Sequence, residues 1–271
     1  MNKKQIPLSC FGLAADAAAM KAAGYHEIEL HIWEIEEMSD STLQGLKRLF
    51  SENDFRCRVA DNPLPLTRRI AASDFHLSDF KDNLKKSADR SAQLGIQYWN
   101  FGNGYARHLL PDVPDAEKKI KEAVYWIAEL TLEYQISLLL EPIGHTITNY
   151  WNTLPQVVCF LKEMNLPHVR AMVDLRWQLD EGRPISELYE YAGWIDHAHI
   201  DNPFTDYAGK KIRTIPRLTD PYDYKEYLDF IKSDSYHGSL SIEALTFSDL
   251  EKELREALDF FGFYGMASRN G

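Results

Sequence analysis

The feature of this sequence that most constrains its fold is a regular alternation of short apolar segments with longer amphipathic ones. Apolar residues with strand-like character occupy eight short stretches, residues 6–12, 26–32, 55–60, 97–101, 138–140, 169–173, 194–200 and 238–244. Between them, segments such as residues 115–130 carry apolar residues at helical spacing. Short apolar strands alternating with helices are typical of a parallel sheet that is covered on both faces. Eight such units in 271 residues predict the α/β fold of a closed (β/α)8 TIM barrel.

An open, doubly wound sheet is the alternative that the same alternation allows. That fold is expected to place a glycine-rich G-x-G-x-x-G turn after its first strand. Here residues 10–15 read CFGLAA and lack the pattern. The chain shows no linker-like composition and no internal repeat. We therefore expect one barrel domain over residues 1–271.

Composition and charge argue against several classes of function. The formal net charge is −11, whereas a nucleic-acid-binding protein is expected to show a basic stripe. No run of about 18 apolar residues indicates a membrane span, and the apolar start is too short and too polar for an export signal. The three cysteines, Cys10, Cys57 and Cys159, are widely spaced with no CxxC pair. These features predict a cytoplasmic protein with reduced thiols that binds neither nucleic acid nor membrane.

Charged or metal-binding side chains end four consecutive predicted strands, which carry Glu141, Asp174, His199 and Glu243. Burying a lone carboxylate costs several kcal/mol unless a partner or a cation compensates it. In a barrel, the C-terminal ends of neighbouring strands meet at one mouth. Mixed carboxylate and imidazole ligands suit a divalent ion such as Mn²⁺, Mg²⁺ or Co²⁺. The alternative is a set of separate buried ion pairs.

Two histidines compete for the ligand position on the seventh strand. His197 and His199 lie two residues apart, so their side chains point to the same face of the strand. His199 is nearer to the end of the strand and therefore to the mouth. We expect His199 to be the ligand and His197 to lie one layer deeper.

Several stretches resemble the xylose isomerase-like TIM barrel superfamily, in particular its sugar isomerase/epimerase branch. The resemblance rests on EPIG at residues 141–144, TNYWNT at 148–153, the Val-Asp pair at 173–174, HAHIDN at 197–202 and SIE at 241–243. It extends over nearly the whole chain. Ketose 3-epimerases, such as the tagatose and psicose epimerases, are well-known members of this branch.

The resemblance implies a cofactor and a reaction. Glu141, Asp174, His199 and Glu243 would bind one divalent metal ion, Mn²⁺ first, with Mg²⁺ and Co²⁺ as alternatives. Glu141 and Glu243 would also act as the acid/base pair that removes and returns a proton beside the carbonyl of a sugar. We therefore predict a metal-dependent sugar isomerase or epimerase. The resemblance also implies assembly into a homo-oligomer or a hetero-complex.

The sugar-binding positions of the epimerases are not matched. Where the epimerases typically have a glutamate, a histidine and an arginine, this chain has Ile147, Trp177 and Thr205. Ile147 and Trp177 would offer an apolar wall in place of polar partners for hydroxyl groups. This difference indicates a substrate with an apolar part, or a different sugar.

His145 is a second candidate base, because it lies in the loop that leaves the fifth strand. The chain also resembles the metal-bearing subunit of C-glycoside deglycosidases. That resemblance implies an alternative reaction, in which a lyase takes a proton beside the carbonyl of a 3-oxo-glycoside and the aglycone is eliminated.

Other polar and aromatic residues near strand ends are candidates for binding the sugar or glycoside: Asp61, Asn103, Asn149, Trp177 and Arg213. Asn and Asp also favour turns, so each of these has a structural alternative. Arg213 could replace the missing arginine, bind a phosphate or be a surface charge. Tyr207, Lys210 and Lys211 share its long segment, and such segments are often binding loops.

Two further classes of function remain as rivals. Endonucleases share the superfamily, but they need several metals and a basic DNA-binding face, which the net charge of −11 disfavours. A non-catalytic carbohydrate-binding barrel with a structural metal would bind the ion and turn over no sugar.

Overall fold

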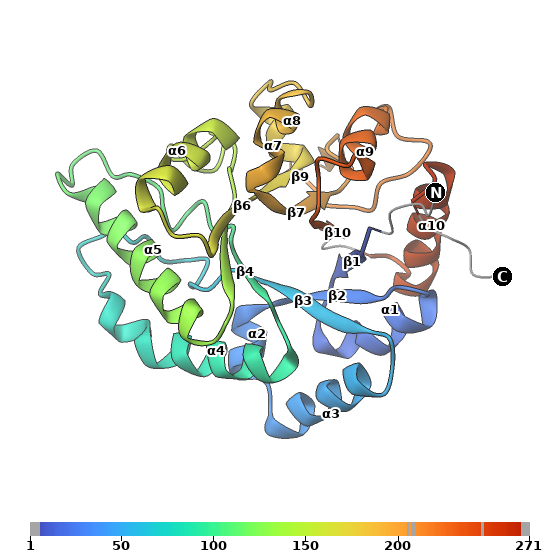
Figure 1. Ribbon diagram of the computed structural model, residues 1–271, viewed down its shortest axis with the longest axis horizontal. Coiled ribbons are helices and arrows are strands. Elements are labelled where there is room, and N and C mark those ends of the chain that lie inside the picture. Colours follow the sequence, from blue (N-terminus) through green and yellow to red (C-terminus); the bar gives the residue numbers. More distant parts are fainter. Residues whose placement is uncertain (1–5, 205, 208–209, 245–246, 267–271) are drawn as a thin grey trace.

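The computed structural model describes residues 6–204, 206–207, 210–244 and 247–266. Its centre is a closed barrel of eight parallel strands in the order β1-β10-β7-β6-β5-β4-β3-β2 (Figure 1). These strands are β1 (Leu8–Phe11), β2 (Glu27–His31), β3 (Arg56–Asp61), β4 (Tyr98–Phe101), β5 (Ser137–Leu140), β6 (Val169–Asp174), β7 (Ile195–Ile200) and β10 (Ser239–Ile242). The predicted TIM barrel is confirmed.

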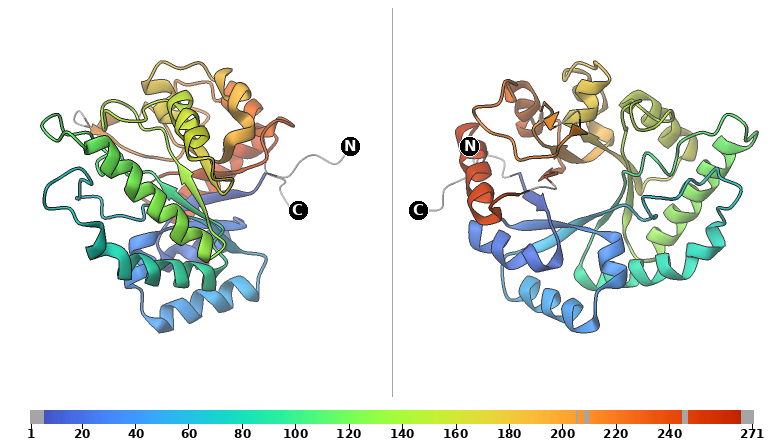
Figure 2. Two further views of the ribbon diagram at one scale, coloured as in Figure 1. Left: turned by 60° about the vertical axis from the view of Figure 1, so that its left-hand side comes forward. Right: turned by 180° about the vertical axis from the view of Figure 1, so that it is seen from behind.

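Helices surround the barrel on its outside, as the views in Figure 2 show. They are α1 (Ala17–Ala23), α2 (Ile32–Glu37), α3 (Asp40–Ser51), α4 (Lys81–Leu94), α5 (Ala116–Glu133), α6 (Leu154–Met164), α7 (Leu175–Asp180), α8 (Glu187–Tyr191), α9 (Lys225–Lys232) and α10 (Leu250–Phe263). Helix α5 shows why they pack there. Ile120, Val124 and Ile127 recur at helical spacing and are completely buried, so their burial fixes which face of the helix meets the barrel.

The barrel closes between the first and last strands. Leu8 of β1 pairs with Leu240 of β10, while Ser9 on the same strand pairs with Glu27 of β2. Because all neighbouring strands are parallel, their C-terminal ends open at one mouth. The register pairs Asp174 with His199, so two predicted ligands lie side by side.

The structure differs from the sequence-based prediction mainly in the segments after strands. Helices α2 and α7 begin directly after β2 and β6, and the sequence pattern did not indicate either helix. Asp174 starts α7, because its carboxylate accepts a hydrogen bond from the backbone N–H of Arg176 at 2.8 Å. The long segment after β7 contains the antiparallel pair β8 (Asp206–Tyr207) and β9 (Lys210–Lys211).

Several residues singled out from the sequence cannot be placed. Thr205 lies outside the described residues, as do the side chains of Tyr207, Lys210 and Lys211. Among the described helices, none is both long and apolar enough to cross a membrane.

Candidate metal and active site

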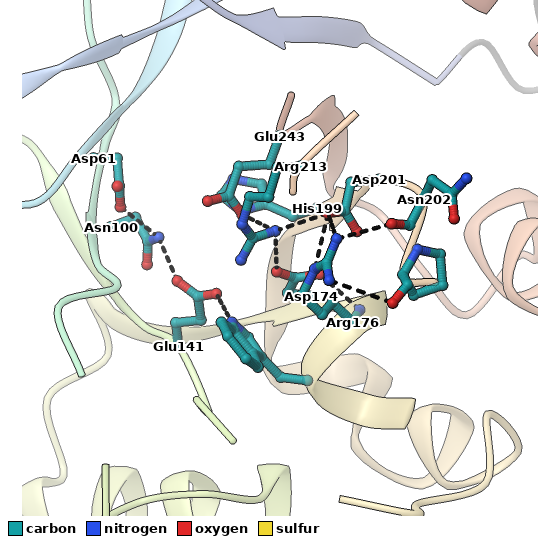
Figure 3. Close-up of polar contacts among 12 residues, drawn as sticks. Asp61, Asn100, Glu141, Asp174, Arg176, His199, Asp201, Asn202, Arg213 and Glu243 are labelled. Carbon is teal, nitrogen blue, oxygen red and sulfur yellow. Dashed lines mark hydrogen bonds and ion pairs between the residues drawn. The ribbon is translucent and has the colours of Figure 1, made fainter. Parts of the chain in front are cut away.

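Four predicted ligands meet at the mouth of the barrel. Glu141 follows β5, Asp174 ends β6, His199 lies near the end of β7 and Glu243 follows β10. One donor atom from each of them lies within 4.8 Å of the donor atoms of the other three. Figure 3 shows these side chains converging from different strands. We call these four residues the ligand cluster.

The chemistry of this ligand cluster fits a divalent cation. It offers three carboxylates and one imidazole, of which Glu141, Asp174 and His199 are buried. Asp174 Oδ2 is itself buried and accepts no hydrogen bond of good geometry from the described residues, although the guanidinium of Arg213 lies 2.9 Å away. Buried acceptors normally have partners. A buried oxygen without one, inside a group of oxygen and nitrogen ligands, is suited to coordinate a cation.

Glu29 supports the imidazole of the ligand cluster from below. His199 Nδ1 faces Glu243 Oε2 at 3.0 Å, and its other nitrogen, Nε2, lies 3.1 Å from Glu29 Oε1. Glu29 also contacts His197 Nε2 at 3.1 Å, and His197 Nδ1 lies 2.8 Å from Ser239 Oγ. A carboxylate on the second nitrogen fixes the ring and the tautomer of a metal-binding histidine. His197 is therefore a buried partner of Glu29, one layer deeper than His199, as predicted.

The charges around His199 perturb its protonation. Burial alone would lower the pKa of His199, but the carboxylates of Glu29 and Glu243 raise that pKa well above its usual value. Burial would likewise raise the pKa of Glu29, yet His199 and His197 lower it. Without a metal, the buried Glu29–His199 pair is therefore an ion pair. Metal binding by the ring must release its proton.

Arg213 brings a guanidinium into the ligand cluster. Its Nη1 lies 2.8 Å from Glu243 Oε2, 2.9 Å from Asp174 Oδ2 and 3.5 Å from Asp201 Oδ2. Nη1 has no hydrogen-bond partner of good geometry among the described residues, so these contacts are electrostatic. The guanidinium also lies over the ring of Trp177, 5.3 Å from its centroid. The positive charge of Arg213 thus lies between the carboxylates of two predicted ligands, Asp174 and Glu243 (Figure 3).

Arg176 holds the segment that carries Arg213. Its guanidinium is fully buried and pairs with Asp201, and its Nε lies 2.9 Å from Asp201 Oδ2. It also donates to the carbonyls of Asn202 at 2.8 Å and of Ile212 at 3.3 Å. The side chain of Arg176 therefore binds both the start of the segment after β7, at Asn202, and its later part at Ile212, next to Arg213.

Glu141 is held by neutral donors. Trp177 Nε1 donates to Glu141 Oε1 at 3.1 Å, and Asn100 Nδ2 donates to Glu141 Oε2 at 3.0 Å. The same Asn100 amide donates to Asp61 Oδ1 at 2.7 Å, and Asn62 donates to the other oxygen of Asp61. Figure 3 shows Asp61, Asn100 and Glu141 in one row.

Burial sets the protonation of these two carboxyl groups. It raises the pKa of Glu141 to about 7, a shift that the carboxylates of Glu243 and Asp174 reinforce and His199 opposes. Burial also raises the pKa of Asp61 well above its usual value, and the charge of Glu141 acts in the same direction. A carboxyl with a pKa near neutrality is suited to both accept and return a proton.

The remaining predicted site residues lie apart from the ligand cluster. Asn103 is buried, accepts from the backbone of Ala106 at 2.9 Å and donates to the carbonyl of Pro65 at 3.1 Å. Asn149 pairs with both backbone groups of Leu109, at 2.7 and 3.1 Å. Their observed contacts hold loops together. Their predicted contacts with a substrate stay predictions.

His145 points toward α7. Its side chain is 67% exposed, and Nδ1 lies 2.6 Å from Glu181 Oε1. The backbone N–H of His145 donates to the same oxygen at 2.6 Å. His145, in the loop after β5, therefore forms a dyad with Glu181, which directly follows α7. These contacts do not test the predicted role of His145 as a base.

Sequence reasoning missed Glu29, Arg176 and Asp201 as parts of the site. The sequence did contain a signal for Glu29. Glu27 and Glu29 alternate with Ile28 and Leu30 on a predicted buried strand, and buried carboxylates need partners. Arg176 and Asp201 follow predicted ligands by two residues each, but their mutual pairing depends on how β6 and β7 lie side by side.

Comparisons with known proteins agree with the barrel fold. Residues 17–262 match the family model described as "Xylose isomerase-like TIM barrel". No curated protein sequence is similar enough to the chain to count as a match.

Similar solved structures include a D-allulose 3-epimerase from Methylomonas sp., with 18% identity, 96% of this chain and 98% of that chain covered, and a TM-score of 0.78. A 3-keto-D-glucoside 4-epimerase from E. coli has 14% identity, coverage of 96% and 100%, and a TM-score of 0.77. A probable 3-DHS dehydratase from Bacillus anthracis has 14% identity, coverage of 98% and 100%, and a TM-score of 0.74. At these identities, the likeness establishes the fold.

Proposed function

Because the chain belongs to the xylose isomerase-like TIM barrel family, we propose that it is a divalent-metal-dependent sugar isomerase or epimerase. The proposed reaction moves a proton at the carbon next to a carbonyl. One observation carries the proposal: donor atoms of Glu141, Asp174, His199 and Glu243 lie within 4.8 Å of one another at the mouth of the barrel. The solved epimerases of the same fold, such as the D-allulose 3-epimerase, support the choice of reaction.

The four residues of the ligand cluster would hold the ion, with Mn²⁺ as the first candidate and Mg²⁺ or Co²⁺ as alternatives. When bound in such a site, a divalent cation supplies Lewis-acid polarisation of a carbonyl group. Glu29 would keep His199 oriented for ligation through its contact with Nε2.

Glu141 and Glu243 would move the proton. Glu141 follows β5 and Glu243 follows β10, and these strands are separated in the barrel by β6 and β7. The two carboxylates therefore lie on different sides of the ligand cluster (Figure 3). The pKa of Glu141, raised by burial to about 7, favours a group that exchanges a proton near neutral pH. Trp177 and Asn100 would keep its carboxylate in place through their hydrogen bonds.

Elemental analysis and solvent exchange together test this proposal. Protein purified without added metal, then loaded with Mn²⁺, should hold about one ion per chain. In D₂O it should incorporate deuterium beside the carbonyl of its sugar substrate. Glu243→Gln should lose or weaken the ion, whereas Glu163→Gln should not, because Glu163 contacts Lys121 at the surface. Wild-type protein that stays without metal in millimolar Mn²⁺ would overturn the proposal. Protein that binds the ion but exchanges no proton of any sugar would be a non-catalytic binding barrel.

A lyase acting on a 3-oxo-glycoside is a second candidate, favoured by the dyad of His145 and Glu181. A carboxylate 2.6 Å from Nδ1 orients an imidazole as general bases require. In this reaction a base takes the proton beside the carbonyl, and the aglycone leaves with the electron pair of its bond to the sugar. If the protein is a lyase, His145→Gln should abolish release of the aglycone. If it is an isomerase or epimerase that uses Glu141 and Glu243, His145→Gln should change the rate of epimerisation by no more than about twofold. Glu181→Gln should follow His145→Gln in either case.

A further inference from the structure

A cavity lies between the outer helices α5 and α6 (Figure 1). Its volume is about 290 Å³, at the lower end of the range of small-molecule sites. Three aromatic rings form a stack beside it, because Tyr150 lies on Trp151 and Trp151 on Phe160, with centroids 4.4 Å apart in both pairs. The described lining residues all differ from the four ligands of the ligand cluster. We call this space the α5–α6 cavity.

Charged side chains in the α5–α6 cavity suit a ligand that carries an ammonium group. Lys121 Nζ lies 3.1 Å from Glu117 Oε1, 2.9 Å from Glu163 Oε2 and 5.4 Å from the centroid of Phe160. The protein thus already places one ammonium between two carboxylates and near the face of an aromatic ring, an arrangement that stabilises cations. Two carboxylates and one ammonium leave a net charge of −1, which attracts a second cation.

Trp151 connects the α5–α6 cavity to the segment that carries Glu141. Its φ is 55°, in the left-handed region that a bulky residue rarely adopts. Its carbonyl accepts from the backbone N–H of Ile143 at 3.2 Å and from Arg107 Nη2 at 3.4 Å, and the same Nη2 donates to the carbonyl of Glu141. Strained residues cluster at functional sites. A ligand that contacts Trp151 therefore acts on the segment that positions Glu141.

We propose that the α5–α6 cavity is a second binding site, for a small aromatic ammonium compound, and that its occupant strengthens metal binding at Glu141. The aromatic group of the ligand would pack against the stacked rings, and its ammonium would share the two carboxylates with Lys121. By holding Trp151 in place, the ligand would lower the cost of ordering the Glu141 segment. The effect on the metal rests on the proposed function, whereas binding of the amine does not.

Size favours a small amine over a protein partner. A cavity of about 290 Å³ accommodates one ring with a short side chain, whereas a specific protein–protein interface buries at least about 1,200 Å² of surface. Trp151 is only 5% exposed and Phe160 only 3%. These rings therefore offer no extended apolar face to a second copy of the chain.

Isothermal titration calorimetry of the metal-free protein with three probes tests the class of ligand. 2-Phenylethylamine carries a ring and a charge, 2-phenylethanol lacks the charge and ethylamine lacks the ring. We expect 2-phenylethylamine to bind at least about tenfold more tightly than either of the others. Glu163→Gln should weaken its binding, and Lys121→Met should strengthen it by about threefold to tenfold, because the competing internal ammonium is gone. Glu251→Gln, which removes the partner of Arg255 on α10, should change nothing.

Cys159 gives an independent readout. It lines the α5–α6 cavity and is exposed, whereas Cys10 and Cys57 are buried. N-ethylmaleimide should therefore label Cys159 in the folded protein, and saturating 2-phenylethylamine should slow that labelling. The labelled protein should no longer bind the amine.

The link to the metal is measured in the same protein. Saturating 2-phenylethylamine should tighten the binding of Mn²⁺ by at least about threefold, and this effect should be lost in protein whose Cys159 has been labelled. Electron paramagnetic resonance of free Mn²⁺ gives the affinity with and without the amine.

Several outcomes would overturn the inference. Equal affinities for 2-phenylethylamine and 2-phenylethanol, or weaker binding of the amine in Lys121→Met, would exclude the aromatic ammonium ligand. A dimer in sedimentation whose Cys159 resists labelling would show that a second copy covers the cavity. Amine binding with unchanged affinity for Mn²⁺ would refute the link to Glu141. Protein that binds the amine but takes up no Mn²⁺ would refute the proposed function and leave the amine site standing.

Discussion

Arg213 Nη1 lies 2.8 Å from Glu243 Oε2, so a fixed cation already contacts one of the predicted metal ligands. The same nitrogen lies 2.9 Å from Asp174 Oδ2. A guanidinium in this position attracts the ligands that a metal needs and repels the metal itself. Arg213 should therefore influence the affinity of the ligand cluster for a metal ion.

Replacing Arg213 with alanine should tighten binding of Mn²⁺ by about tenfold or more, because its positive charge contacts Asp174 and Glu243 and would oppose the binding of a cation there. Electron paramagnetic resonance of free Mn²⁺ measures the affinity. Arg217→Ala is the matched control, since Arg217 lies in the same segment and pairs with Glu253 at 2.9 Å. Weaker Mn²⁺ binding in Arg213→Ala would mean that the guanidinium instead preorganises the ligands.

Metal affinity should rise with pH. Burial raises the pKa of Glu141 to about 7, and the carboxylates around His199 raise its pKa well above the usual value. Both groups bind a metal only when deprotonated, so protons compete with the ion below about pH 7 at Glu141 and at still higher pH at His199. We expect the apparent affinity for Mn²⁺ to increase by about tenfold to a hundredfold from pH 6 to pH 8. Calorimetry in two buffers of different ionisation enthalpy counts the released protons, and no release at pH 6 would contradict the prediction.

Glu29→Gln should weaken metal binding by about tenfold to a hundredfold, because the carboxylate that orients His199 is lost. Glu27→Gln is a stringent control. Glu27 lies two residues earlier on the same strand, is equally buried and pairs with Arg56 and Arg58. Both variants should lose stability in thermal unfolding, but only Glu29→Gln should lose metal. Equal metal binding in the two variants would assign Glu29 a purely structural role.

Trp177→Phe keeps an aromatic ring, although a smaller one, and removes the indole N–H that donates to Glu141 Oε1 at 3.1 Å. We expect kcat to fall by about tenfold, because a hydrogen bond to a charged group contributes about 1.5–3 kcal/mol. The acidic limb of the pH–rate profile should also move to higher pH, since the N–H favours the ionised form of Glu141. Trp194→Phe, whose ring lies under Arg170 away from the ligand cluster, should leave the profile unchanged. An unchanged profile in Trp177→Phe would exclude a role in orienting Glu141.

Gly102 should tolerate no side chain. A methyl group there would overlap Glu141 Oε2 and come within 2.9 Å of Asn100 Nδ2 and 3.0 Å of Asp61 Oδ1. Gly102→Ala should therefore displace Glu141 and reduce metal content and activity together. Gly45→Ala in α3 meets no atom within 4 Å, and it should raise thermal stability slightly, since alanine favours helix. Full metal content in Gly102→Ala would show that Glu141 is not a required ligand.

The sequence by itself determined the barrel and the place of its ligand cluster. Eight apolar strands that alternate with helices, without the glycine-rich turn of an open doubly wound sheet, predict a closed parallel barrel. Parallel strands bring their C-terminal ends to one mouth. Residues at those ends, such as Glu141, Asp174 and His199, must then meet. Their convergence follows from the parallel direction of the strands, which the alternation of strands and helices in the sequence predicts.

Only the tertiary structure decided which side chains surround the ligand cluster. Arg213 reaches Asp174 because Arg176 binds both ends of the intervening segment, and Asn149 turns instead to the backbone of Leu109. Loop side chains take their direction from contacts with residues distant in sequence, and strand periodicity does not constrain them. The same reason explains why Trp177, predicted as an apolar wall, donates a hydrogen bond to Glu141.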